Sequence, residues 1–294
     1  QSSKMSNTAN LLFFSLPCYA LERYVNPNKY KEGGVKNAAA DVRPFSIQNA
    51  QRHQTGSNKI YGTKEKAAVV GVAIGNVSLP THPAMQKRMF NLNAPESPFK
   101  DGVVKYTATV GFEETNRAFL NIIASSGFNT DGLYSQITDG GSQAMELIII
   151  GTCGAAGTKD KPLLLIDAAY TNYKAMADRT GRATVSVQRT LLDSGKFTLP
   201  DLSQIEQVIE KHKPGAMVVI PYDNPTGHFY NQETMIALAD SASNTPLDNR
   251  DEAYRELFYV PEKTSSVWGL TEQDVPGIAG RRISIETASK VWNA

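Results

Sequence analysis

The chain has 294 residues, 41% of them hydrophobic, and it carries 30 Lys and Arg against 29 Asp and Glu. This balance of charge excludes a basic surface for nucleic acid or for an anionic membrane, and no apolar stretch approaches the roughly 20 residues that span a bilayer. The two cysteines, Cys18 and Cys153, make no disulfide framework, which favours a reducing compartment and hence the cytoplasm.

The N-terminal part of the chain is mostly polar but contains one short apolar run, Leu11–Ala20. Lys4 precedes this run, as in a secretory signal, but Pro17 interrupts it, so a packed N-terminal segment is the favoured interpretation. Residues from about 24 to about 62 are polar and show no sustained period. We therefore expect an N-terminal arm or extension over residues 1–62.

From Ala67 onward, apolar runs alternate with amphipathic segments. The predicted helices are Glu113–Ser126, Gln143–Ile150 and Asp201–His212, and the predicted strands are Tyr134–Thr138, Pro162–Asp167, Ala183–Val187, Ala216–Pro221 and Arg282–Ile285. Continuous apolar strands between such helices predict an α/β fold, with a mostly parallel sheet covered on both faces. Ligands bind beyond the carboxyl ends of such strands, so Asp167 and Asn224, which follow two of them, are candidate site residues.

Two glycine-containing segments have a plain structural interpretation and a functional one. Asn224-Pro225-Thr226-Gly227 is typical of a turn, but after an apolar strand it also carries the Asn224 amide over the sheet edge, where its N–H groups can meet an anionic oxygen. Thr138–Gln143 is either a simple strand–helix connection or a glycine nest at a helix N-terminus, where Gly141 and Ser142 would bind an anion.

Three further residues are chemically informative only in combination. Asp251 is either a first-turn helix residue or a carboxylate that faces a pyridine nitrogen. Lys290 is flanked by the hydroxyls of Thr287 and Ser289, which suit a phosphate beside a nucleophilic amine. Tyr170 is either a half-buried core residue or a ring that stacks on a flat ligand. The histidines, His53, His82, His212 and His228, show no metal-ligand spacing, so no metal site is predicted.

From Ala67 to the end of the chain, the order of these motifs resembles the class I/II aminotransferases of pyridoxal phosphate (PLP) fold type I. The matching residues are Gly75-Asn76, Tyr106 with Gly111, Gly140–Ala144, Asp167 with Tyr170, Asn224–Gly227, Asp251–Tyr254 and Thr287–Lys290. The resemblance implies a three-layer α/β/α large domain over 85–294, preceded by the N-terminal part of a small domain over 63–84. It also implies a homodimer that transfers an amino group between an amino acid and a 2-oxo acid in amino-acid metabolism or biosynthesis.

The resemblance further implies roles for single residues. Lys290 would carry PLP as a Schiff base and move the substrate Cα proton. Asp251 would pair with the ring nitrogen, while Asn224 and Tyr254 would hydrogen-bond the ring oxygen. The remaining implied contacts are Tyr170 on the ring, Gly141, Ser142, Thr287 and Ser289 on the phosphate, Tyr106 on the phosphate of the neighbouring subunit, and Gly75 with Asn224 on the substrate.

Three departures from the family pattern qualify these expectations. The polar segment Pro246–Arg250 stands where the family has an apolar strand, so a strand before Asp251 is missing or cut short. The segment Pro221–Asp223 is one residue longer than usual. The arginines that bind phosphate and substrate carboxylate in the family follow the lysine, beyond Ala294, so we expect residues 1–294 alone to transaminate poorly. A carbon–sulfur lyase or other α-elimination enzyme of this fold, and an inactive relative with a binding or regulatory role, remain alternatives.

Overall fold

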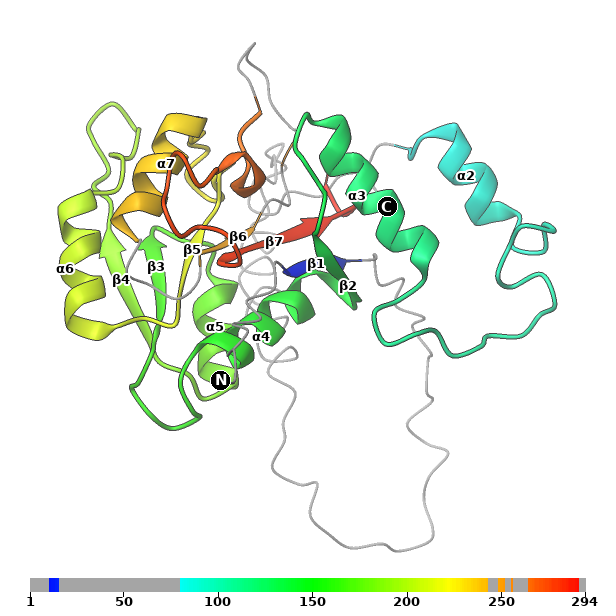
Figure 1. Cartoon of the computed structure of the whole chain (residues 1–294), viewed down its shortest axis with the longest axis horizontal. Coiled ribbons are helices and arrows are strands. Elements are labelled where there is room, and N and C mark those ends of the chain that lie inside the picture. The colour runs from blue at the N-terminus through cyan, green and yellow to red at the C-terminus, as the bar shows by residue number, and fades with distance from the viewer. Residues whose placement is uncertain (1–10, 16–79, 243–247, 252–254, 256–263, 291–294) are drawn as a thin grey trace, which may run out of the picture. The chain divides into compact units, whose positions relative to one another are not determined.

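The computed structural model describes residues 11–15, 80–242, 248–251, 255 and 264–290 (Figure 1). The chain divides into two compact units, residues 1–18 with 77–294, and residues 19–76. The second unit lies outside the described residues, and so does Gly75 within it. All the elements named below belong to the first unit.

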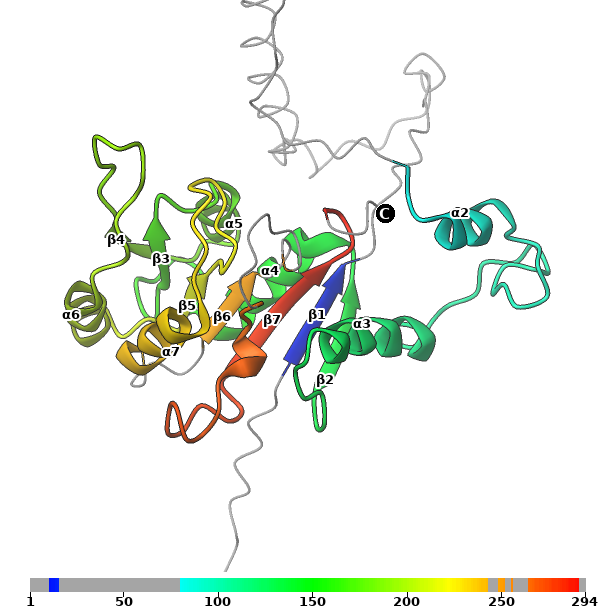
Figure 2. The same ribbon diagram turned by 90° about the horizontal axis from the view of Figure 1, so that it is seen from above.

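In the described part of the chain, seven strands form one sheet in the order β2-β1-β7-β6-β5-β3-β4 (Figures 1 and 2). The strands are β1 (Leu11–Ser15), β2 (Tyr134–Thr138), β3 (Leu163–Asp167), β4 (Thr184–Gln188), β5 (Ala216–Val219), β6 (Asp248–Asp251) and β7 (Arg282–Thr287). All neighbouring strands of this sheet run parallel. Their carboxyl ends therefore meet at one edge, as the sequence predicted.

Helices cover both faces of the sheet. The helices are α2 (Pro83–Phe90), α3 (Glu113–Ser125), α4 (Gly140–Thr152), α5 (Asn172–Arg179), α6 (Leu202–His212), α7 (Gln232–Ser241) and the 3₁₀ turn η1 (Val267–Gly269). Leu163 and Leu165 of β3 pack with α4 and α5, whereas Leu164 and Ile166 pack with α3, α6 and α7. This alternation confirms the predicted three-layer α/β/α fold, because successive strand residues point to opposite faces.

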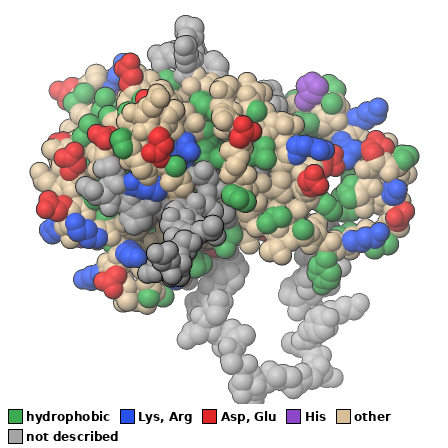
Figure 3. All heavy atoms as spheres, in the orientation of Figure 1, with side chains coloured by type: hydrophobic (Ala, Val, Ile, Leu, Met, Phe, Trp, Pro, Cys, Tyr) green, Lys and Arg blue, Asp and Glu red, His purple; other side chains and the backbone are tan. Residues whose placement is uncertain are grey.

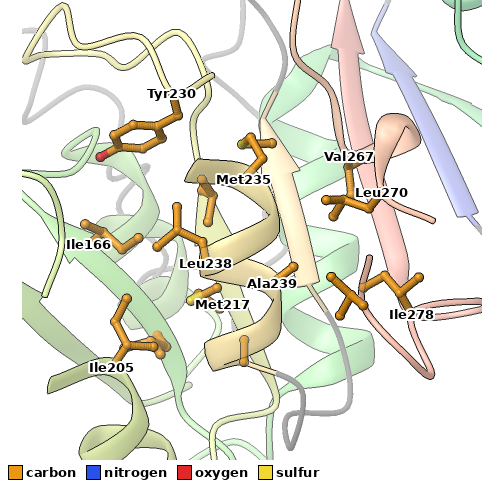
Figure 4. Packing of buried hydrophobic residues seen from close by; sticks show 14 of the residues in the cluster. Ile166, Ile205, Met217, Tyr230, Met235, Leu238, Ala239, Val267, Leu270 and Ile278 are labelled. Atoms are coloured by element: carbon orange, nitrogen blue, oxygen red, sulfur yellow. The ribbon is translucent and has the colours of Figure 1, made fainter. Parts of the chain in front are cut away.

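The core between α7 and the sheet shows how the layers are held (Figure 4). Met235 and Leu238 of α7 are fully buried and belong to one cluster with Met217 of β5. Burying a side chain of this size stabilises the fold by about 1.5–3 kcal/mol. Tyr230, just before α7, lies at the edge of this cluster, with its hydroxyl directed away from the α7 residues.

Strand β1 lies within residues 1–62, where we expected an arm or extension, and within the apolar run Leu11–Ala20, where we favoured a packed segment. Leu11 pairs with Tyr134 of β2 on one side and with Ile283 of β7 on the other, and the register continues to Ser15. Pairing with a strand on each side satisfies the backbone N–H and C=O groups of this short run, although the run is far from both partners in the sequence. The sheet of the predicted 85–294 domain therefore includes a strand from outside that range.

Strand β6 is the short strand that the polar sequence before Asp251 left uncertain. Asp248–Asp251 forms four residues of strand, paired with β5 through Met217 and with β7 through Arg282. The sequence pattern gives little sign of it, because the hydrogen bonds that define this strand come from two neighbours far away in the sequence. Asp251 is its last residue and stands opposite Ile285 of β7.

Candidate functional site

A pocket of about 190 Å³ lies where β3, β5 and β7 end. Its lining residues are Gly141, Ser142, Met145, Tyr170, Tyr173, Met176, Ile220, Asn224, Thr287, Ser289 and Lys290. This is also where the connections change direction, because β3 is followed by α5 on one face of the sheet and its neighbour β5 by α7 on the other. Such switch points are the usual ligand sites of parallel α/β sheets.

The N-terminus of α4 forms one wall of the pocket. Gly140 begins the helix at a φ of +77°, a backbone conformation that glycine adopts readily. A Cβ atom on Gly141 would lie 3.1 Å from Cγ2 of Thr287, so glycine at this position allows the first turn of α4 to lie against β7. The first N–H groups of a helix have no intrahelical partner and attract anions. This wall is therefore suited to a phosphate group.

Thr287 supports the same conclusion. Its Oγ1 atom is buried, and it has no hydrogen-bond partner among the described residues. A buried hydroxyl without a partner costs about 1–3 kcal/mol, so an acceptor oxygen beside it would recover that free energy. The hydroxyl of Ser289, two residues further along, lines the same pocket and is exposed. Together with α4, these hydroxyls make a donor set that fits a phosphate.

Tyr170 forms the aromatic wall. Its ring lies edge-on to the buried ring of Tyr173, with centroids 5.5 Å apart and an interplanar angle of 79°. Nδ2 of Asn172 donates a hydrogen bond of 2.8 Å to the Tyr170 hydroxyl. These contacts fix the ring at the pocket wall, where it can stack on a flat ligand.

Asn224 and Lys290 bring an amide and an amine to the same pocket. Asn224 lies in a tight turn after β5. The Gly227 N–H donates to the carbonyl of Asp223 at 2.8 Å, and the Asp223 N–H donates to the carbonyl of His228 at 2.8 Å. Lys290 is half-buried and stands three residues beyond the end of β7.

The structure does not bring every predicted site residue to this pocket. Asp251 ends β6, the strand between β5 and β7, so its backbone lies at the same sheet edge. Tyr106 is fully exposed in the segment between α2 and α3, and it is not among the lining residues. Tyr254 and Gly75 lie outside the described residues.

Sequence reasoning missed a buried polar network beside the pocket. Nη1 of Arg189 lies 2.6 Å from Oδ2 of Asp223 and donates to the Tyr230 hydroxyl at 2.6 Å. Burial raises the pKa of Tyr230 to about 12, so its hydroxyl stays neutral. The position of Asp223 directly before Asn224 was a local signal for this network, but helix α6 and strand β5 separate Arg189 from Asp223 in the sequence.

Two classes of feature were not found in the described part of the chain. None of its groups of His, Cys, Asp and Glu is arranged to hold a metal ion. Likewise, among these residues no helix combines the length and apolarity that a membrane span requires.

A second buried ion pair, Arg255 with Glu286 at 2.5 Å, links the segment after β6 to β7.

Comparison with known proteins identifies the fold. No family model matches the chain. The sequence is 33% identical over 123 residues to histidinol-phosphate aminotransferase 2 of Mannheimia succiniciproducens, a match that covers 41% of this chain and 31% of the relative. The structure is similar to N-succinyldiaminopimelate aminotransferase from Mycobacterium tuberculosis, with a TM-score of 0.62, 20% identity, and 85% of this chain and 58% of that chain covered.

A solved lyase shares the same architecture. The PLP-bound C–S lyase from Staphylococcus hominis, in complex with the inhibitor L-cycloserine, matches with a TM-score of 0.58 and 15% identity, over 79% of this chain and 58% of that chain. The chain thus spans 58% of the length of these two solved structures and 31% of the curated relative. The sheet, its layers and these similarities show that the chain has the large-domain fold of the fold-type I PLP enzymes.

Proposed function

We propose that this chain forms the cofactor-binding part of a PLP-dependent aminotransferase, which transfers an amino group between an amino acid and a 2-oxo acid. The observation that carries the proposal is the composition of one pocket, which combines the Lys290 amine, the Asn224 amide, the Tyr170 ring and the N-terminus of α4. An amine, a donor to a ring oxygen, a stacking surface and a phosphate site are what PLP requires of a protein.

Each part of the pocket has a task in this proposal. When bound, PLP supplies an electron sink for charge that develops at the substrate Cα. The Lys290 amine holds the cofactor and carries the proton to and from Cα. The Tyr170 ring orients the cofactor by stacking, and Asn224 donates to its ring oxygen.

The remaining proposed contacts rest on the family resemblance together with the fold. The backbone of Gly141 and Ser142 and the hydroxyls of Thr287 and Ser289 bind the phosphate. Asp251 keeps the ring nitrogen protonated, because a carboxylate stabilises a positive charge beside it. Tyr254 is a second donor to the ring oxygen.

We also propose that the protein is a cytoplasmic homodimer. From the last residue of α2 to the start of α3, large apolar side chains are exposed to solvent. Phe90 is 80% exposed, Val104 is 82% exposed and Tyr106 is fully exposed. Figure 3 shows hydrophobic side chains among charged ones in this part of the molecule. An exposed apolar segment of this kind is typical of an interface, and from a second copy Tyr106 would reach the partner's phosphate site.

A carbon–sulfur lyase is the second candidate function, because the solved lyase from Staphylococcus hominis shares the fold. The two reactions use the same cofactor contacts and differ in the fate of the substrate. A single-turnover experiment with the PLP-loaded protein and a panel of amino acids separates them. Transamination yields a 2-oxo acid and pyridoxamine phosphate, whereas elimination from a sulfur amino acid yields pyruvate, ammonia and a thiol. Pyruvate and ammonia without pyridoxamine phosphate would contradict the transferase assignment.

A further inference from the structure

We propose that Arg189 is a positioning residue, which holds the Asp167–Tyr170 segment and the Asp223–Gly227 turn in a fixed relation so that Tyr170 and Asn224 face the same ligand. The inference rests on the proposed function, because it concerns the two residues that would contact the PLP ring. It concerns a residue that does not line the pocket itself.

The first half of the argument is the contact of Arg189 with the end of β3. Arg189 directly follows the edge strand β4, and its guanidinium reaches over the carboxyl end of the neighbouring strand β3. Its Nε donates to the carbonyl of Asp167 at 3.3 Å, and its Nη2 donates to the carbonyls of Ile166 and Ala168. The backbone N–H of Arg189 donates to the same Asp167 carbonyl at 2.7 Å. The chain that leads to Tyr170 is thus held at three successive carbonyls.

The second half is the contact with the turn after β5. Nη1 of Arg189 lies 2.6 Å from Oδ2 of Asp223, and the Thr226 hydroxyl donates to the same carboxylate oxygen. Asp223 and Thr226 bracket Asn224, so the carboxylate fixes both sides of the residue that lines the pocket. The same Nη1 also donates a hydrogen bond of 2.6 Å to the Tyr230 hydroxyl, and this second bond fixes the direction of the guanidinium.

The network borders the pocket directly. Arg189, Asp223 and Tyr230 line a small cavity of about 10 Å³, and two other residues of that cavity, Tyr173 and Ile220, also line the candidate site. The side chains of Arg189 and Asp223 are 1% and 4% exposed, so the pair is fully desolvated. Arginine carries five N–H donors on three nitrogens of a planar fork, so it can reach acceptors that lie apart, whereas the three donors of lysine share one nitrogen.

A buried ion pair is weak evidence of stabilisation, because a well-packed apolar pair of similar size is often as stable. This property gives a direct test. The double variant Arg189→Met with Asp223→Leu removes both charges together, so that no unpaired charge is left in the core. A merely structural role predicts that the double variant has the thermal stability and the cofactor affinity of the parent protein. A positioning role predicts that it has the stability of the parent protein but a lower cofactor affinity.

The test compares four proteins with the parent: Arg189→Lys, the double variant, Asn224→Ala and the core variant Leu238→Ala. Leu238 is fully buried in α7, in a core cluster that contains none of the pocket-lining residues, so this variant lowers stability without changing the lining of the pocket. Three quantities are measured for each: the Tm without cofactor, the Kd for PLP, and the pH midpoint of the absorbance of bound PLP. Amide hydrogen exchange without cofactor is measured for peptides that cover residues 167–170 and 223–228.

We expect Arg189→Lys and the double variant to raise the Kd for PLP about tenfold or more, the size of effect typical of a lost charge-assisted hydrogen bond. Their pH midpoint should move in the same direction as that of Asn224→Ala, and exchange should accelerate in both peptides. Leu238→Ala should lower Tm and leave the midpoint at the parent value. Unchanged exchange in both peptides of Arg189→Lys would overturn the inference, and so would a double variant with parental Kd. A parent protein that binds no PLP would overturn the proposed function, and with it this role for Arg189.

Discussion

At the scale of single residues, the Thr287 hydroxyl is the clearest sign that the pocket takes a ligand. Its oxygen is buried and unpartnered within the described residues. Thr287→Val keeps the shape and removes this oxygen, so we expect the free energy of unfolding of the ligand-free protein to rise by about 1 kcal/mol. The Kd for PLP should increase in the same variant. Chemical denaturation and a cofactor titration measure the two effects, and Thr287→Ser, which keeps the hydroxyl, is the control. A variant that binds PLP as tightly as the parent would contradict the assignment.

Gly141 permits a second test at this scale. An added Cβ would approach Cγ2 of Thr287 to 3.1 Å and Cγ2 of Ile285 to 3.5 Å, so Gly141→Ala must displace the α4 terminus or the Thr287 methyl group. We expect the Kd for PLP to rise, because either displacement disturbs the phosphate site. Gly151→Ala, in the same helix, meets no atom within 4 Å and should stabilise the protein by about 0.5–1 kcal/mol. Equal effects of the two variants on PLP affinity would show that the close contact has no role.

The sequence could predict the residues of this pocket that belong to local motifs, but not those that support them. Asn224 and Lys290 stand in short segments whose chemistry can be read in isolation, and the structure brings both to one cavity. Arg189 gives no such sign, since its role depends on the order of β4, β3 and β5 in the sheet. Met145 and Met176 line the pocket only because two helices pack on the same face.

At the scale of elements, α6 shows how a helix start depends on pH. The side chain of Asp201 accepts hydrogen bonds from the backbone N–H groups of Ser203 at 2.9 Å and Gln204 at 3.3 Å, and from the Ser203 hydroxyl at 2.7 Å. These hydrogen bonds lower the pKa of Asp201 below its ordinary value of 3.8, and the bond from the Ser203 hydroxyl has the largest effect. The cap therefore stabilises the helix fully above pH 3.8 and loses its effect as the pH falls through the lower folded-state value.

Asp201→Asn keeps a capping oxygen but cannot titrate in this range. We expect the parent to lose more stability than this variant on acidification below pH 3.8, so that the difference in their free energies of unfolding shrinks or reverses. Urea denaturation at pH 5 and at about pH 3 measures the difference, in which other titrating groups cancel. A difference that does not change with pH would mean that the ionisation of Asp201 is not coupled to the stability of the protein.

The elements that the sequence predicted well are those with a strong local pattern. The amphipathic helix predicted at Asp201–His212 is α6, and the apolar run before Asn224 contains β5. Strand β6 could not be predicted with assurance, because its polar residues form a strand only through pairing with β5 and β7. Strand β1 was missed because it is separated from its neighbours in the sheet by more than a hundred residues.

At the scale of the whole molecule, the exposed apolar segment between α2 and α3 predicts self-association. Val104 is 82% exposed within this segment, so Val104→Asp should leave the fold intact and weaken the proposed dimer. Sedimentation velocity over a range of concentrations measures the shift toward monomer. Leu191→Asp, at another exposed apolar position, is the control and should leave the association unchanged. A parent protein that stays monomeric at all concentrations would contradict the proposed dimer.

The central claim is that the pocket at the carboxyl edge of the sheet holds PLP on Lys290. It is tested most directly by adding PLP to the purified protein, reducing with borohydride and mapping the labelled peptide by mass spectrometry. We predict that the phosphopyridoxyl group is found on Lys290 and that Lys290→Ala abolishes the labelling, whereas Lys211→Ala, at an exposed position of α6, leaves it unchanged. Labelling on other lysines, or none at Lys290, would contradict the account.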